Sequence, residues 1–269
     1  MISITNSNFQ THPFHLVSPS PWPILMSFCL LTLTTSGVLT MHAFLSSQSF
    51  LMLALITLIS SMSFWFRDVI YEATYLGNHT LAVQTGLNMG VGFFIVSEAL
   101  FFLSVFWTFF HSAVLPNVAV GGNWPPIGID SINPFELPLY NTILLLSSGI
   151  TVTYAHHCLI QSNRSGALHG LILTVALAFF FTVLQAVEYL VSSFTLSDSI
   201  FGSCFYFGTG FHGLHVIIGT AFIAVGLWRV LAYHSTENHH LGVESSILYW
   251  HFVDIVWLAL YLSIYYWGY

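Results

Sequence analysis

One acidic residue, Glu98, lies near the middle of a long apolar run and is the first candidate for chemistry in the sequence. Between Met89 and Phe110 no other side chain can ionise. If this run crosses a membrane, an ionised carboxylate there is costly unless it is paired, so we expect a buried, neutral acid that donates a hydrogen bond. Proton handling or contact with lipid would use such a group; a structural link between two helices is the alternative.

Two further acids have a polar residue three positions earlier, which places each pair on one helix face. They are Glu188 with Gln185, and Asp254 with His251. We interpret both pairs as polar links at helix interfaces inside a bundle. A proton-coupled transporter that uses Glu98 and Glu188 stays open as an alternative.

Fourteen histidines raise the question of a bound metal. His212 and His215 are three residues apart, and adjacent pairs occur at 156–157 and 239–240. Adjacent residues point to different helix faces, and the Glu-x-x-His pattern of carboxylate-bridged metals is missing. We therefore expect no metal in this chain, with a membrane oxygenase that holds a histidine-bound metal as the alternative.

The elements that must position these residues are membrane helices. Of the 269 residues, 56% are hydrophobic and only 5% are charged, whereas soluble domains carry about 25% charged residues. Lipid must therefore be the main solvent. Lys and Arg together number three, which excludes nucleic acid as a partner.

Apolar runs long enough to cross the hydrocarbon core occur seven times. We expect helices at 22–44, 50–66, 81–112, 139–160, 167–192, 202–231 and 244–267. The expected fold class is all-α, a polytopic membrane protein with a single membrane domain. Six glycines in the run 202–231 predict that this span is central in the bundle, because small residues let helices approach closely.

The arginines predict the orientation of the chain. With seven spans, Arg67, Arg164 and Arg229 all fall on the side of the N-terminus. The positive-inside rule then places the N-terminus on the inner side of the membrane and the C-terminus on the outer side.

Several stretches of the sequence match a known family. They include HPFHLVSPSPWP at 12–23, WFRDVIYEATYLGNHT at 65–80, SEALFF at 97–102, WPPIGI at 124–129, TGFHGLHVIIG at 209–219 and HFVDIVWLALYLSIYYWG at 251–268. Through these motifs the chain resembles subunit III of mitochondrial-type cytochrome c oxidase, in the haem-copper oxidase subunit III family. The resemblance covers nearly the whole chain in order.

The resemblance implies an N-terminal arm with a two-helix bundle (1–66), a connection (67–80) and a five-helix bundle (81–269), with lipids in a cleft between the bundles. It implies a core, non-redox subunit of complex IV that supports assembly, proton uptake and turnover stability of the catalytic subunit I. Haem a and copper would lie in partner subunits. This chain would bind only phospholipids, including cardiolipin, in the mitochondrial inner membrane, with its N-terminus in the matrix and its C-terminus toward the intermembrane space.

The resemblance also implies which side chains meet the cleft lipids, and it implies no catalytic or metal-binding residue in this chain. Carried over by position, the lipid-binding residues are Arg67, His79, Glu98, Trp107, His111, His212, His215 and Arg229, with His234 close to the last of them. Three positions depart from the family pattern: Tyr71 and Ala232 replace basic residues of many animal members, and Asn123 replaces a usual cysteine.

Overall fold

The computed structural model describes residues 11–118, 121–237 and 239–269. In this part of the chain, seven helices are long and apolar enough to cross a membrane, which confirms the all-α fold class and the number of spans. Their bounds are α1 Trp22–Met41, α2 Ser47–Thr74, α3 Leu81–Val114, α4 Leu137–Ile160, α5 Arg164–Val191, α6 Ser199–Leu231 and α7 Leu241–Leu260. A short π-helix, η2 Tyr261–Tyr266, follows α7 directly.

Helix α2 is longer than the sequence predicted. The apolar run was expected to end at 66, but the helix continues to Thr74. Hydropathy reports only the apolar part of a helix, whereas Arg67 and Glu72 belong to the same helix beyond that part. The connection expected at 67–80 therefore shortens to residues 75–80.

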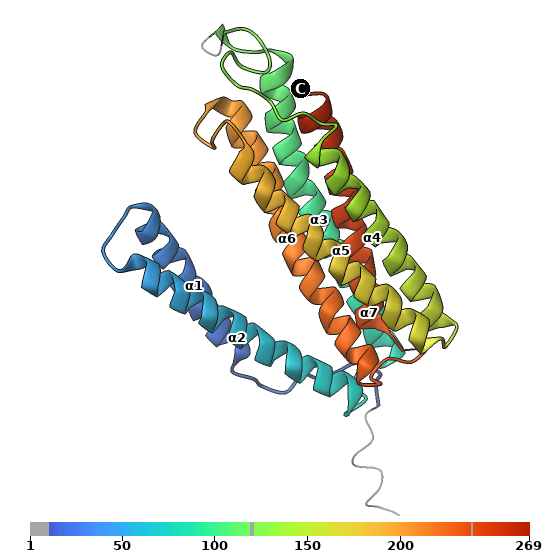
Figure 1. The fold of residues 1–269 in the computed structure, drawn as a ribbon. Helices are drawn as coiled ribbons and strands as arrows, with labels where there is room; N and C mark the ends of the chain where they lie inside the picture. Colours follow the sequence, from blue (N-terminus) through green and yellow to red (C-terminus); the bar gives the residue numbers. More distant parts are fainter. Residues whose placement is uncertain (1–10, 119–120, 238) are drawn as a thin grey trace, which may run out of the picture. The chain divides into compact units, whose positions relative to one another are not determined.

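The chain divides into two compact units, Met1–Leu87 and Asn88–Tyr269. In the first unit, α1 and α2 lie side by side and run in opposite directions (Figure 1). Trp22 joins them, because its indole Nε1 donates to Asp68 Oδ2 over 2.7 Å. The division falls in the first turns of α3, whereas the resemblance placed it between residues 67 and 80.

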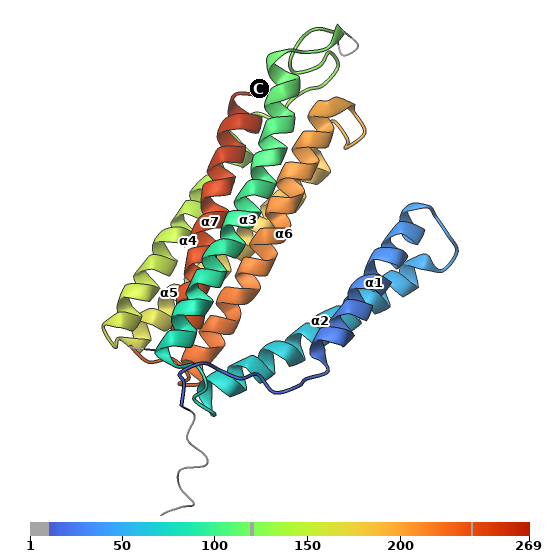
Figure 2. The ribbon, with the colours of Figure 1, turned by 180° about the vertical axis from the view of Figure 1, so that it is seen from behind.

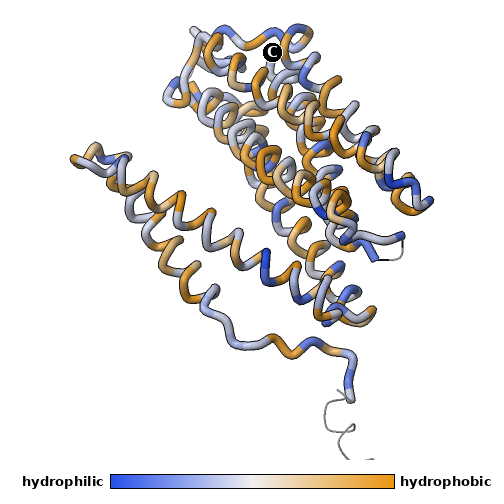
Figure 3. Tube along the Cα trace, turned by 60° about the horizontal axis from the view of Figure 1, so that its bottom comes forward, coloured by the Kyte–Doolittle hydropathy of each residue, from blue (hydrophilic) through white to orange (hydrophobic). Residues whose placement is uncertain are grey.

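The second unit is a bundle in which α3, α5 and α7 run in one direction and α4 and α6 in the other (Figures 1 and 2). Hydrophobic residues lie along each of these helices (Figure 3). The most enclosed helix is α7, with 67% of its apolar segment buried against 33% for α6. The expectation that span 202–231 is the central one is therefore wrong.

Glycines mark close approach between helices and not enclosure. On α5, a Cβ at Gly170 would lie 2.8 Å from the Ala155 Cβ of α4. On α6, a Cβ at Gly219 would lie 3.0 Å from the Trp250 ring of α7. Gly208, Gly219 and Gly226 of α6 thus make room for side chains of α7. The large side chains of α7 fill the centre of the bundle.

Candidate functional site

Glu98 has a partner that the sequence did not predict. Its carboxyl Oε2 lies 3.0 Å from Nε2 of His215 on α6. The Glu98 side chain is 26% exposed, so this acid is half-buried and the full burial that we expected is not seen within this chain. The pair joins α3 to α6, since each residue belongs to a different helix.

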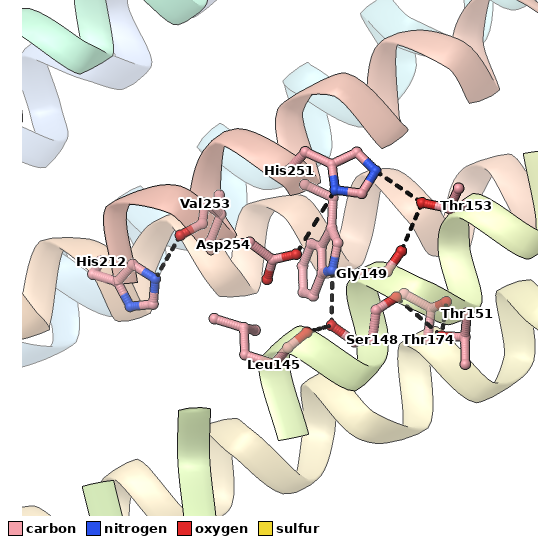
Figure 4. A network of polar contacts seen from close by, with 11 residues as sticks. Leu145, Ser148, Gly149, Thr151, Thr153, Thr174, His212, His251, Val253 and Asp254 are labelled. Carbon is pink, nitrogen blue, oxygen red and sulfur yellow. Dashed lines mark hydrogen bonds and ion pairs between the residues drawn. The ribbon is translucent and has the colours of Figure 1, made fainter. Parts of the chain in front are cut away.

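His212 lies inside the bundle and not on its surface. It is 1% exposed, and its ring packs 5.7 Å from that of Phe181 and 5.0 Å from that of Trp257, centroid to centroid. Its Nε2 donates to the carbonyl oxygen of Val253 over 3.2 Å (Figure 4). Aromatic side chains of this chain therefore surround the ring, and the lipid contact expected for His212 stays a prediction.

A second polar cluster joins α4 to α7 (Figure 4). The Thr153 hydroxyl donates to the Gly149 carbonyl over 2.8 Å, and His251 Nε2 lies 3.2 Å from the same hydroxyl oxygen. The hydroxyl has only one proton to donate, so His251 must be the donor in the second contact. Asp254 Oδ2 lies 3.8 Å from His251 Nδ1, which is too long for a hydrogen bond.

Two tryptophans of α7 extend this link along α4. Trp250 Nε1 donates to Ser148 Oγ over 2.9 Å, and Trp257 Nε1 donates to Thr142 Oγ1 over 3.0 Å. Both rings are buried, and a buried indole N–H needs an acceptor. Ser148 and Thr142 were not among the residues predicted from the sequence. Hydroxyl residues in an apolar span are a signal that could have identified them as acceptors for the tryptophans.

A third cluster surrounds Glu188, which is 1% exposed. Its Oε1 accepts from Gln185 Nε2 over 3.0 Å and from the Tyr265 hydroxyl over 2.5 Å. Gln185 in turn accepts from Asn141 Nδ2 of α4 over 3.4 Å. These contacts place Gln185 and Glu188 at the interface of α4, α5 and η2, and they add Asn141 and Tyr265, which the sequence analysis did not identify.

The arginines of the second unit lie at the same end of the bundle but have different surroundings. Arg164 donates to the Val230 and Leu231 carbonyls, which end α6. The Arg229 guanidinium lies against α7, where a Cβ at Gly242 would be 2.5 Å from Nη1. Arg229 Nε is enclosed and has no hydrogen-bond partner among the residues that the structure describes.

The other predicted lipid residues are divided between the two units. In the first unit, Arg67 pairs with Asp68 at 2.8 Å, and the His79 ring lies 6.0 Å from that of His15. In the second unit, Trp107 and His111 are exposed near the end of α3. The remaining residue, His234, packs its ring 5.4 Å from that of Trp228, near the opposite end of the bundle.

Across residues 11–118, 121–237 and 239–269, no three side chains of the metal-binding types His, Cys, Asp and Glu are grouped as ligands. The polar side chains instead bond in pairs and short chains across helix interfaces, with amide, carboxyl, hydroxyl or backbone groups as partners. The fold and these clusters define a seven-helix membrane protein whose bundle is joined by buried polar links.

Comparison with known proteins gives the family. The family described as cytochrome c oxidase subunit III matches residues 12–269. The chain is 67% identical to cytochrome c oxidase subunit 3 of Emericella nidulans over 269 residues, and 67% identical to that of Podospora anserina over 268 residues, covering 100% of each chain. The corresponding protein of Neurospora crassa is 65% identical over 268 residues. The chain belongs to the cytochrome c oxidase subunit III family.

Proposed function

We propose that this chain is a core, non-redox subunit of cytochrome c oxidase in the mitochondrial inner membrane. It supports assembly, proton uptake and turnover stability of the catalytic subunit I, which reduces oxygen and pumps protons. Haem a and copper belong to partner subunits, and phospholipids, including cardiolipin, are the molecules that this chain itself holds. Membership of the family supports the place in the complex.

The observation that best supports lipid binding is the surroundings of the Arg229 guanidinium. Arg67 has a carboxylate partner and Arg164 has two carbonyl partners. Arg229 Nε, in contrast, has neither among the described residues, although it is enclosed. Arg229 lies in the last turn of α6, beside the half-exposed Trp228. A cation next to an interfacial tryptophan is suited to the phosphate of a lipid headgroup.

The orientation follows from the same charges. Arg164 and Arg229 occupy one end of the second unit, and Asp130 lies at the other end, where its carbonyl accepts from Ser193 Oγ. The positive-inside rule supports a matrix location for the arginine end. The N-terminus then lies in the matrix and the C-terminus faces the intermembrane space.

Membership of the complex can be tested by an affinity tag on this chain. The purified complex should show haem a absorption in its visible spectrum, and the chain separated from its partners should not. Purification of the tagged chain without any haem a would refute the proposed place in the oxidase. Iron that stays with the separated chain in stoichiometric amount would instead support the oxygenase alternative.

The lipid role can be tested with Arg229→Gln and Arg229→Lys. Loss of one cation near a lipid phosphate weakens the binding of that lipid by about 1 kcal/mol, which is about five-fold in affinity. The glutamine variant should therefore lose co-purified anionic lipid and inactivate after fewer turnovers, with the initial rate of oxygen reduction unchanged. The lysine variant keeps the charge and should restore both. If the glutamine variant fails in its first turnovers as a fully assembled complex, Arg229 has a direct part in the reaction.

A further inference from the structure

The Glu98–His215 contact is the only side-chain hydrogen bond that joins α3 to another helix in the part of the chain that the structure describes. Other polar side chains of α3, such as Ser97 and Ser104, donate to carbonyls of their own helix. Glu98 lies about 25 Å along α3 from Leu81, and His215 lies about 24 Å from either end of α6, at 1.5 Å per residue. The contact is therefore at the middle of both helices.

The second ring nitrogen of His215 fixes its tautomer. Nδ1 lies 2.7 Å from the carbonyl oxygen of Phe211, one turn earlier on α6. A carbonyl oxygen can only accept, so Nδ1 must carry a proton and donate it. In a neutral imidazole only one nitrogen carries a proton, and Nε2 would then present a lone pair to Glu98.

An ionised Glu98 facing that lone pair would place two acceptors 3.0 Å apart with no proton between them. A further proton resolves the conflict, either on the carboxyl group or on Nε2. We propose that Glu98 and His215 form a proton-binding site in which the two side chains share one proton. With that proton the pair has no net charge, whether it exists as acid and imidazole or as carboxylate and imidazolium.

The surroundings of the pair favour this neutral state. His215 is 7% exposed, and its ring packs 5.1 Å from Phe102 and 6.3 Å from Tyr249 of α7. The other titratable group of α6 near the site is His212, which already donates to a carbonyl. Arg229, the nearest arginine along α6, is about 21 Å further along that helix. Loss of the proton would leave an uncompensated anion at mid-depth, which is costly in a membrane.

The site allows a proton to move without any change in total charge. Transfer from Glu98 to His215 breaks the O–H bond, forms the Nε2–H bond and leaves a carboxylate beside an imidazolium. The reverse transfer restores two neutral groups. Both forms keep the hydrogen bond between α3 and α6, so the link persists while the proton changes position.

The proposal can be tested by nitrogen NMR of the intact oxidase with ¹⁵N-labelled histidine, in which His215→Gln identifies the His215 signals. Nδ1 should be protonated, and Nε2 should show a strong hydrogen bond with a shared proton. Glu98→Gln should convert Nε2 to a simple acceptor, and Glu188→Gln, a matched change at a membrane acid outside the pair, should leave the signals of His215 unchanged.

Two results would overturn the proposal. The first is a His215 ring whose Nδ1 lacks a proton, since the tautomer argument would then fail. The second is an Nε2 signal that Glu98→Gln does not alter. If Glu98→Gln fails to assemble, a wild-type complex in which Nε2 shows no shared proton overturns the proposal by itself.

Discussion

Gly149 of α4 lies directly against the carboxyl group of Asp254 on α7. A Cβ at Gly149 would be only 2.5 Å from Asp254 Oδ2. Asp254 Oδ1 is enclosed and has no hydrogen-bond partner among the described residues. The absence of a side chain at Gly149 therefore lets α7 bring an acid to the surface of α4.

The first prediction follows from this contact. Gly149→Ala should destabilise the bundle by about 1 to 3 kcal/mol, because the added methyl group must displace the Asp254 carboxyl. The measurement is the thermal midpoint at which this chain is lost from the purified complex. The matched control is Gly213→Ala on α6, where nothing lies within 4 Å of the added Cβ. An equal loss in both variants would show that helix glycines are generally required, and that the contact with Asp254 is not the cause.

The second prediction concerns the cluster around Glu188. Tyr265→Phe removes a hydroxyl that donates to Glu188 Oε1 over 2.5 Å and leaves that buried oxygen with one donor fewer. The expected loss of stability is about 1 to 3 kcal/mol. Tyr266→Phe is the control, since Tyr266 is 57% exposed. Equal thermal midpoints for both variants would contradict a stabilising role of the Tyr265 hydroxyl.

Much of the fold could be predicted, because apolar run length reports directly on helices that must cross hydrocarbon. The end of α2 could not, since the helix continues through Arg67 after the apolar run has ended. The central position of α7 was also missed. The burial of a helix depends on how many other helices surround it. The glycines of α6 indicate only that a neighbouring helix packs closely against α6.

The polar clusters could likewise be predicted only in part from the sequence. Spacing of three residues correctly placed Gln185 beside Glu188, because both lie on one helix face. Spacing could not pair Glu98 with His215, which are 117 residues apart in the chain and meet only through the contact of α3 with α6. The likeness to the family named both residues but assigned them to lipid, and their hydrogen bond to each other was therefore not anticipated.

The third prediction tests the orientation of the chain. In a background without Cys29, Cys158 and Cys204, single cysteines can be introduced as Ile127→Cys and Leu76→Cys, both at exposed positions. A membrane-impermeant maleimide added to mitochondria with a ruptured outer membrane should label only the first, since residues 75–80 are expected in the matrix. Labelling of Leu76→Cys alone would reverse the orientation. Detergent should expose both sites, which controls for reactivity.

The last prediction asks how strongly Glu98 and His215 depend on each other. Glu98→Gln should be close to wild type in stability, because the amide group can donate to Nε2 of His215. Glu98→Leu should be less stable by about 1 to 3 kcal/mol, because it leaves that buried nitrogen without a partner. Combining it with His215→Leu removes the unsatisfied group as well, so the double variant should lose less than the sum of the two single changes.

The coupling free energy between Glu98 and His215 should amount to about 0.5 to 3 kcal/mol, as is usual for residues in direct contact. Thermal midpoints of the assembled complex, measured for the wild type, both leucine variants and the double variant, give this value. Ser104→Ala provides a control on α3, because its hydroxyl donates only to Phe101 of the same helix. It should show no coupling to His215→Leu. Strict additivity of Glu98→Leu and His215→Leu would mean that the 3.0 Å contact does not hold α3 to α6.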